Sequence, residues 1–274
     1  MTYSPLVNLG DGLSGRLSPG PGERILWIHG YALDSSSWGE LWDRLPDLYH
    51  VGIDLPGHGR SLPLPGAQEL PELARRVAKQ ALDHGVRHIV ALSAGTFVAL
   101  QMAIEHPGAF ASLVLGSPLP SSGAIGEPFW GRYRELVSMN RMAGHGEHLR
   151  GRLMLVEPSL FSGAHERLAL WERLWAIVGQ HPFWDLTDAS LVRLARKSQT
   201  AAYLKGVEAP TLLVVGKKEA PSGRRRATRL MQALPRCERL DLPGVSRLSL
   251  LEAPSEAARA IGSHIRARSQ AGAR

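Results

Sequence analysis

Short runs of apolar and β-branched residues alternate along this chain with longer segments whose apolar positions recur at helical spacing. Nearly continuous apolar runs are typical of strands buried on both faces of a parallel sheet. The strands that we expect lie at residues 24–30, 50–57, 88–93, 111–117, 211–216 and 238–243. The expected helices lie at residues 36–45, 69–84, 94–106, 222–234 and 254–267. This order predicts an α/β fold with a mostly parallel, twisted sheet and helices on both faces.

The alternation stops between residues 118 and 206, where the sequence carries no convincing strand pattern. The segments in this stretch that are amphipathic with a helical period span residues 129–142, 164–179 and 188–204. We therefore expect residues 118–206 to form a helical cap inserted into a core. The two parts of that core are residues 1–117 and 207–274.

Four of the seven tryptophans lie in the predicted cap. We expect most of the cap's aromatic side chains to pack against the core, because large apolar rings dominate such interfaces. The remaining aromatic residues are candidates for lining an apolar ligand pocket, and we assign this role to Trp130, Trp171 and Trp175.

The overall composition is that of a globular protein, with 44% hydrophobic and 21% charged residues in 274. No apolar run approaches the ~18 residues that a membrane span needs, and the first residues lack the pattern of a signal peptide. Cys237, the single cysteine, cannot form a disulfide within the chain. We expect a cytoplasmic protein without a membrane partner.

The formal net charge of +7 could indicate a polyanionic partner, so the distribution of the basic residues matters. They cluster at residues 224–229 and 264–274 without interleaved aromatic residues, and no helix-turn-helix, zinc or RNA-binding pattern accompanies them. We therefore expect no nucleic-acid partner, no metal and no cofactor. A small molecule with an apolar portion is the expected substrate or ligand.

A strand that turns directly into a helix carries the strongest chemical pattern in the chain. In HIVALSAGTFVALQMAIEHP, the expected strand ends at Ser93 and the helix begins just after it, with Ala91 and Gly95 two residues away on either side. Small residues at these positions let a strand and a helix pass closely, and the sharp turn projects the central hydroxyl from the sheet. This arrangement predicts a nucleophilic serine at Ser93.

Further motifs occur in an order and at a spacing that resemble the α/β-hydrolase superfamily. They are the strand and loop WIHGYALDSSSW, the turn DLPGHGRS, the Ser93 turn and the late strand APTLLVVGKKE. The resemblance covers nearly the whole chain and is strongest to small capped members such as carboxylesterases and pimeloyl-ester esterases. It implies an α/β-hydrolase fold, in which the backbone N–H groups of Tyr31 and Ala94 form the oxyanion hole.

The same resemblance implies positions for the other two members of a catalytic triad. The acid position, after the strand at residues 211–216, is occupied by Glu219. The histidine position falls in GVSRLSLLEAP and is occupied by Arg247. A guanidinium stays protonated and offers no lone pair, so Arg247 cannot serve as a general base. We expect it to form an ion pair with Glu219 instead.

No histidine lies between His181 and His264, so a replacement base has to come from elsewhere in the chain. The histidines of the predicted cap could reach Ser93 if the cap folds over it; these are His145, His148, His165 and His181. The other histidines belong to motifs or positions where a structural or surface role is expected.

Three functions fit these residues. The first is a serine hydrolase that acts on a small ester or thioester with an apolar portion and has a degenerate triad. The second is a catalytically impaired, hydrolase-like protein that binds a small ligand without cleaving it. The third is a lyase or cyclase in which the oxyanion hole and Arg247 polarise a carbonyl group.

Overall fold

The computed structural model describes residues 4–120, 128–156 and 160–272, and the side chains of residues 128–130 and 271–272 lie outside this description. One sheet has the strand order β1-β2-β4-β3-β5-β6-β7-β8. From β3 to β8 neighbouring strands pair in parallel, whereas β1 and β2 add an antiparallel edge. The strands are β1 (Leu6–Gly10), β2 (Leu13–Ser18), β3 (Arg24–Ile28), β4 (Tyr49–Ile53), β5 (His88–Leu92), β6 (Ser112–Gly116), β7 (Thr211–Gly216) and β8 (Cys237–Leu242). The predicted α/β-hydrolase fold class is confirmed.

The antiparallel hairpin of β1 and β2 is absent from the predicted strands, which begin at residue 24. Its strands are short and only partly buried, so they lack the continuous apolar runs of the parallel strands. The turn between them has positive φ values at Gly10, Asp11 and Gly12, which are 96°, 51° and 74°. Gly and Asp residues between two short strands are a known hairpin pattern, so the hairpin could have been predicted from this turn.

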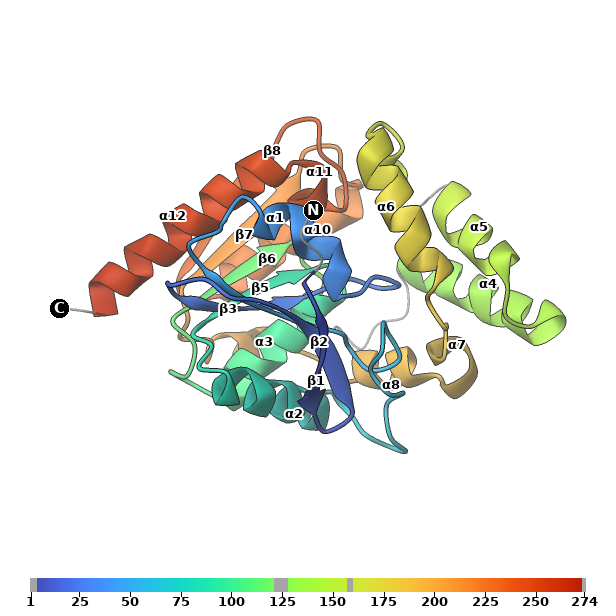
Figure 1. The fold of residues 1–274 in the computed structure, drawn as a ribbon, viewed down its shortest axis with the longest axis horizontal. Coiled ribbons are helices and arrows are strands. Elements are labelled where there is room, and N and C mark those ends of the chain that lie inside the picture. Colours follow the sequence, from blue (N-terminus) through green and yellow to red (C-terminus); the bar gives the residue numbers. More distant parts are fainter. Residues whose placement is uncertain (1–3, 121–127, 157–159, 273–274) are drawn as a thin grey trace.

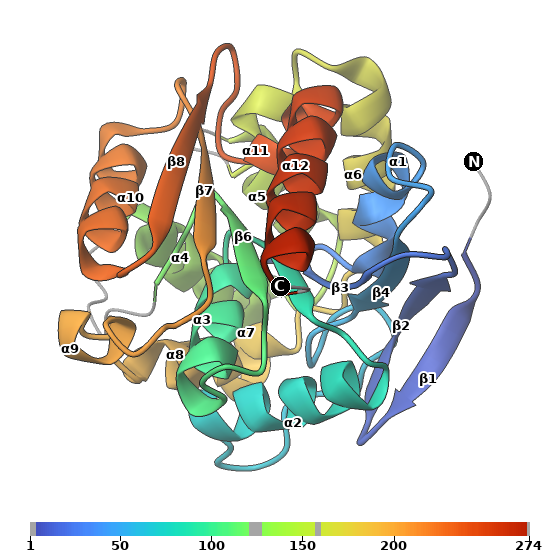
Figure 2. The same ribbon diagram turned by 90° about the vertical axis from the view of Figure 1, so that its left-hand side faces the viewer.

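Helices cover both faces of the sheet (Figures 1 and 2). Helices α1 (Gly39–Trp42) and α12 (Pro254–Gly272) contact each other on one face, and α2 (Leu70–Asp83) and α3 (Gly95–Glu105) pack together on the other. Helix α10 (Pro221–Ala233) contacts β7 and β8 near the far edge. This two-sided cover explains why the strands β5, β6 and β7 are buried at every position.

The single helix predicted at residues 36–45 is wrong in extent. A 3₁₀ turn, η1 (Ser35–Trp38), comes first and the short helix α1 follows it. The Asp34 side chain accepts a hydrogen bond from the backbone N–H of Ser36 at 2.8 Å and caps this tighter turn. Aspartate and serine satisfy backbone groups locally in this way and so compete with a regular α-helix.

The described parts of the stretch between β6 and β7 contain helices and no strand. They are α4 (Pro128–Ala143), α5 (Glu147–Leu155), η2 (Ser162–Ala164), α6 (Leu168–Gly179), α7 (Asp185–Asp188), α8 (Ser190–Arg196) and α9 (Ala201–Leu204). Figure 1 shows α4, α5 and α6 side by side at the end of the molecule opposite the C-terminus. Helix α5 was not predicted, because its sequence EHLRGRLML has no clear apolar period. The division into a cap at residues 118–206 and a core at residues 1–117 and 207–274 stays a prediction.

A continuous apolar cluster joins the sheet, its helices and the helices between β6 and β7. Trp27 on β3 and Trp38 in η1 are fully buried, and Phe161 and Leu174 belong to the same cluster from the inserted segment. The inserted helices are therefore packed on the core by burial of apolar side chains.

Within the described residues, no helix is long and apolar enough to cross a membrane.

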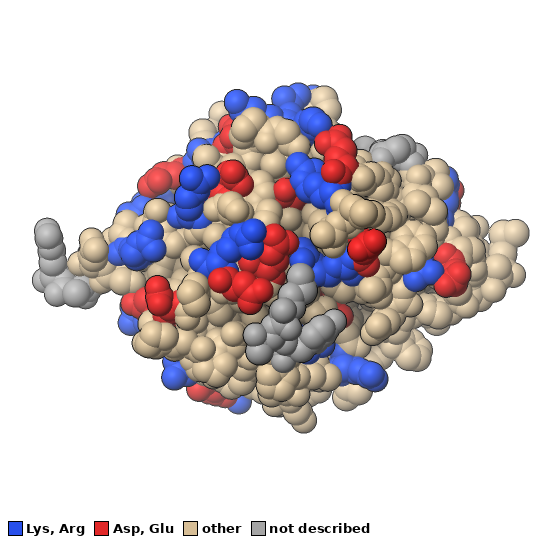
Figure 3. Space-filling model, turned by 45° about the horizontal axis from the view of Figure 1, so that its top comes forward, with Lys and Arg blue, Asp and Glu red and all other residues tan. Residues whose placement is uncertain are grey.

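Basic and acidic side chains are interspersed on the face drawn in Figure 3 rather than gathered into one basic area. Oppositely charged side chains also pair in the described residues: Glu40 lies 3.1 Å from Arg44 and 3.2 Å from Arg173, and Lys218 lies 3.1 Å from Glu166. Partly exposed pairs of this kind stabilise a fold only slightly. On this face the excess of positive charge is spread out.

Candidate active site

Ser93 occupies the turn between the end of β5 at Leu92 and the start of α3 at Gly95. Its φ angle is 50°, a left-handed conformation that is rare for a residue with a side chain. The backbone is held there by the Ser93 N–H, which donates to the Gly116 carbonyl at 2.9 Å, and by the Thr96 hydroxyl, which donates to the Ser93 carbonyl at 2.5 Å. Strain at a single polar residue is typical of a functional turn.

Close packing around this turn explains its small residues. A Cβ at Gly95 would lie 2.5 Å from the His29 carbonyl oxygen and 2.6 Å from that of Ile28, so only glycine lets α3 start against β3. Ala91 is fully buried. The sequence therefore dictates the Ser93 turn locally, through the space that its neighbours leave.

The two predicted oxyanion donors come from the loop after β3 and from the Ser93 turn. Tyr31 follows Gly30 in that loop, and Ala94 follows Ser93; both residues are buried. The backbone N–H of Ala94 makes no hydrogen bond to a described residue, and it stands at the N-terminus of α3 where the helix dipole favours negative charge. Tyr31 and Ala94 also line one cavity together. Their role in stabilising an oxyanion stays a prediction.

Glu219 lies just beyond β7 and its side chain is only 3% exposed. Gly223 makes room for it, because a Cβ there would lie 2.2 Å from Glu219 Oε1. Burial raises the pKa of the Glu219 carboxyl, and the positive charge of Arg247 offsets part of that rise. The glutamate is therefore placed inside the protein, and a solvated position beside Lys217 and Lys218 is excluded.

Arg247 contacts Glu219 as expected. Its Nη1 lies 3.5 Å from Glu219 Oε1, a long ion pair, and its side chain is 14% exposed. The loop that carries Arg247 is held by Glu252, whose carboxylate accepts hydrogen bonds from the backbone N–H groups of Ser246 at 2.7 Å and Leu248 at 2.9 Å. The two loops that would hold the acid and the base of a triad are thus brought together, with an arginine in place of the base.

No histidine makes a hydrogen bond to Ser93 within the described residues. The His29 Nε2 accepts from the Leu55 N–H at 2.9 Å, which makes this imidazole a support for the neighbouring turn. Of the cap histidines, His165 packs on Trp171 with ring centroids 4.2 Å apart, and His145 is exposed. His181 is buried against His58 and Phe183. A direct histidine base for Ser93 is not formed in the described residues.

The predicted pocket tryptophans are placed in different ways. Trp171 and Trp175 lie half-buried on α6, with their ring centroids 5.6 Å apart, and the Arg150 guanidinium stacks 4.2 Å from the ring centre of Trp175. Trp130 lies on α4, but its side chain is outside the described residues. The role of these three residues in a ligand pocket stays a prediction.

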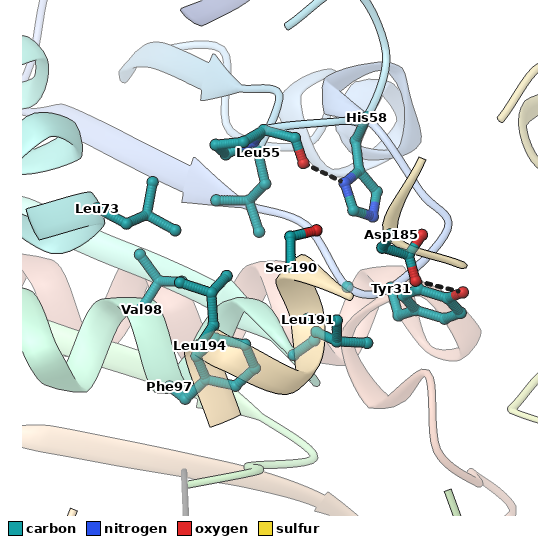
Figure 4. A pocket seen from close by; sticks show the side chains of 13 residues that line it. Tyr31, Leu55, His58, Leu73, Phe97, Val98, Asp185, Ser190, Leu191 and Leu194 are labelled. Atoms are coloured by element: carbon teal, nitrogen blue, oxygen red, sulfur yellow. Dashed lines mark hydrogen bonds between the residues drawn. The ribbon is translucent and has the colours of Figure 1, made fainter. Parts of the chain in front are cut away.

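A cavity of about 30 Å³ adjoins the Ser93 turn on the side of α2, α3 and α8 (Figure 4). It is lined by Tyr31 and Ala94 together with His58, Asp185 and a set of apolar side chains. His58 and Asp185 were not predicted as site residues, because they are far apart in the sequence. The i, i+4 spacing of His181 and Asp185 was the only local indication of a polar cluster.

Metal-ligating residues do not gather here: in the part of the chain that the structure describes, no group of three or more His, Cys, Asp or Glu residues could hold a metal ion. What the arrangement offers is a strained serine hydroxyl, a helix N-terminus beside it and a buried Glu219–Arg247 pair. These parts can hold and polarise a carbonyl group, and they lack a conventional proton acceptor.

A strained serine between a strand and a helix, on a parallel sheet of this order, defines an α/β-hydrolase. The family model described as "Alpha/beta hydrolase family" matches residues 25–260, and the chain belongs to this family. The chain is also similar to the pimeloyl-[acyl-carrier protein] methyl ester esterase of Yersinia pseudotuberculosis. That relative is 26% identical over 241 residues, which cover 86% of this chain and 91% of the relative.

Two other similarities differ in extent. The dihydrolipoyllysine-residue acetyltransferase component of the acetoin cleaving system of Cupriavidus necator is 37% identical over 109 residues, but these cover only 39% of this chain and 29% of that protein. A solved structure of a thermophilic esterase from Thermogutta terrifontis aligns with a TM-score of 0.76 and 23% identity, covering 93% of this chain and 94% of the esterase. At this identity the structural similarity supports the fold alone.

Proposed function

We propose that this protein is a serine hydrolase that acts on a small ester or thioester with an apolar portion. The observation that carries the proposal is the left-handed conformation of Ser93, with φ 50°, at the junction of β5 and α3. In this role the Ser93 hydroxyl attacks the carbonyl carbon, and the N–H groups of Tyr31 and Ala94 receive the developing oxyanion. The C–O or C–S bond then breaks, the serine proton passes through solvent to the leaving alcohol or thiol, and water hydrolyses the acyl-serine. The similarity to methyl ester esterases supports the same class of reaction.

The triad of this hydrolase is degenerate. Glu219 and Arg247 stand at the acid and histidine positions and pair with each other, at 3.5 Å, instead of forming a proton relay. Positioned general bases typically contribute about 10²–10⁴ in rate. We therefore expect Ser93 to react slowly with esters and faster with strongly electrophilic reagents.

A fluorophosphonate probe and a panel of short-chain nitrophenyl esters test this function, with Ser93→Ala as the control variant. The expected result is covalent labelling and slow ester turnover in the parent protein, both lost in Ser93→Ala. Arg247→His supplies an imidazole next to Glu219, so we expect turnover to rise by about 10²–10⁴ in that variant. If Ser93→Ala retains the labelling and turnover, the proposed nucleophile is wrong.

A second candidate function follows from the Glu219–Arg247 pair itself. A protein that binds a small ligand without cleaving it would keep the fold and the loops while losing the base. In that case the parent shows neither labelling nor turnover, and Arg247→His gains both. This outcome separates a degenerate binding protein from a slow enzyme.

A further inference from the structure

The helices between β6 and β7 form a second, larger pocket, which opens to solvent. Helix α7 contacts both α4 and α8 (Figure 1), and residues of these three helices line a volume of about 420 Å³. Small-molecule sites commonly have volumes of about 300–1,000 Å³. None of the described residues that line this pocket is assigned to the proposed hydrolysis. The pocket is therefore large enough for a ligand of its own.

Two arginines of α4 give the pocket a positive wall. Arg134 and Arg141 both line it, and two turns of helix place them on one face of α4, about 10 Å apart along the axis. Both side chains are exposed, and neither forms an ion pair or a side-chain hydrogen bond with a residue that the structure describes. These two guanidinium groups are therefore available to a ligand.

No acidic side chain balances this wall from within the pocket, since none of the described lining residues is Asp or Glu. Asp188 at the end of α7 is already engaged. Its Oδ1 accepts from the Ser190 N–H at 2.8 Å, and Arg193 donates to its backbone carbonyl at 2.5 Å. The pocket therefore carries an excess of positive charge, which favours an anion.

Aliphatic side chains form much of the remaining lining. Val137 lies on α4 between the two arginines, Val192 faces the pocket from α8, and both are only partly buried. Leu186 of α7 is 3% exposed and adds to the same apolar wall. The hydroxyl of Tyr133 donates to the Asp185 carbonyl at 2.6 Å, and its ring is 3% exposed, so it offers a ligand little aromatic surface. An alkyl chain suits this lining better than a ring that needs a stacking partner.

The two parts of the lining match the two parts of an amphipathic anion. A guanidinium offers parallel N–H donors to the two oxygens of a carboxylate. Partly exposed aliphatic side chains favour an alkyl chain that leaves water with them. An ammonium head on the same chain is disfavoured, because both arginines repel it.

We propose that this pocket binds a medium-chain alkyl carboxylate. The carboxylate lies between the guanidinium groups of Arg134 and Arg141, and the chain lies along Val137 and Val192. Binding here uses no residue of the Ser93 turn, so the proposal does not rest on ester hydrolysis.

Isothermal titration calorimetry at pH 7 and low ionic strength tests the site with sodium octanoate, octylammonium chloride and sodium butanoate. We expect octanoate to bind about tenfold or more tightly than octylammonium, because two charge pairs replace two repulsions. Butanoate should bind at least about tenfold more weakly than octanoate, since each methylene group removed from water adds up to about fourfold in affinity. Equal binding of octanoate and octylammonium, or no binding of octanoate, overturns the proposal.

Variants at exposed positions place the bound octanoate. The double variant Arg134→Gln/Arg141→Gln is expected to bind it about tenfold more weakly, because each partly exposed charge pair contributes up to a few-fold. Ser138→Asp puts a carboxylate between the two arginines and should weaken binding as well. Arg196→Gln is the matched control with unchanged affinity, because Arg196 is exposed on α8 outside the pocket lining. Unchanged affinity in the double variant places octanoate elsewhere and contradicts the site.

A lipid surface is the competing source of anionic head groups, and sedimentation with phosphatidylglycerol vesicles separates it from a soluble ligand. We expect octanoate to bind in the absence of vesicles. A protein that sediments with the vesicles but does not bind octanoate uses these arginines at a membrane surface, and the proposal is then wrong. Because binding is measured directly, failure of the proposed esterase activity leaves these results unaffected.

Discussion

The loop that carries Arg247 depends on one buried carboxylate, and Glu252→Gln tests that dependence. Glu252 has no exposed side-chain surface and accepts hydrogen bonds from the backbone N–H groups on both sides of Arg247, at 2.7 and 2.9 Å. A glutamine of the same size has one oxygen and one NH₂ group. It can accept one of these bonds, and its NH₂ group then faces the second N–H.

The expected cost follows from those two contacts. A hydrogen bond to a charged group contributes about 1.5–3 kcal/mol, and a buried donor left unpaired costs about 1–3 kcal/mol. Relief of a buried charge offsets part of this, since burial already raises the pKa of Glu252. The contact with Arg167, at 3.6 Å, adds little because that side chain is 28% exposed. We expect a net loss of about 2 kcal/mol in the free energy of unfolding.

Urea unfolding at pH 7 measures this loss, with Glu256→Gln as the matched control. Glu256 is half exposed on the first turn of α12 and, among the described residues, forms an ion pair only with Arg259 at 3.5 Å, so a change below about 0.5 kcal/mol is expected there. A Glu252→Gln protein that unfolds within about 0.5 kcal/mol of the parent refutes the reasoning. In the Arg247→His background, the same substitution should also reduce the regained ester turnover, because it loosens the loop that carries the imidazole.

Two further substitutions test the packing and the charge of the site. Gly95→Ala places a Cβ 2.6 Å from the Ile28 carbonyl oxygen at the end of β3, so we expect a loss of about 3 kcal/mol in urea unfolding. Gly131→Ala, with open space around it among the described residues, should gain about 0.5–1 kcal/mol. Equal stabilities of the two variants would contradict the close passage of α3 and β3. The pKa of Asp185 is raised from 3.8 to about 6, so the folded state holds this proton more tightly than the unfolded chain. The stability it contributes is therefore fully present below pH 4 and is lost as the pH rises to about 6, amounting to about 3 kcal/mol. In Asp185→Asn this part of the pH profile of unfolding should be flat relative to the parent, and an unchanged profile would show that Asp185 is not buried as a carboxyl group.

Much of the core of the fold could be predicted from the chain itself, because its elements depend on local patterns. The parallel strands begin within one residue of the predicted positions and end at most four residues from them. They could be predicted because continuous apolar runs are typical of strands buried on both faces. The Ser93 turn is equally local: Gly95 is needed wherever a helix begins so close to a strand. The hairpin of β1 and β2 was missed, since these short, partly buried strands carry no continuous apolar run.

The placement of Arg247 at the histidine position of a triad is a different kind of prediction. It came from the resemblance to a family, which placed Glu219 and Arg247 at neighbouring positions, and the structure shows their contact at 3.5 Å. Whether Ser93 is the nucleophile remains for the ester and probe experiments to decide. The structure adds that Glu219 is buried, which a run of two lysines before it did not indicate.

The sequence by itself determined the parallel sheet and the close strand-to-helix turn at Ser93, because each follows from a few neighbouring residues. Only the tertiary structure brought His58 and Asp185 to one cavity and placed Glu252 under the Arg247 loop. Apolar burial drives helices onto the sheet without specifying which polar side chains meet there. The partners of a buried carboxylate are therefore decided by how the inserted helices pack on the core, and no local pattern encodes them.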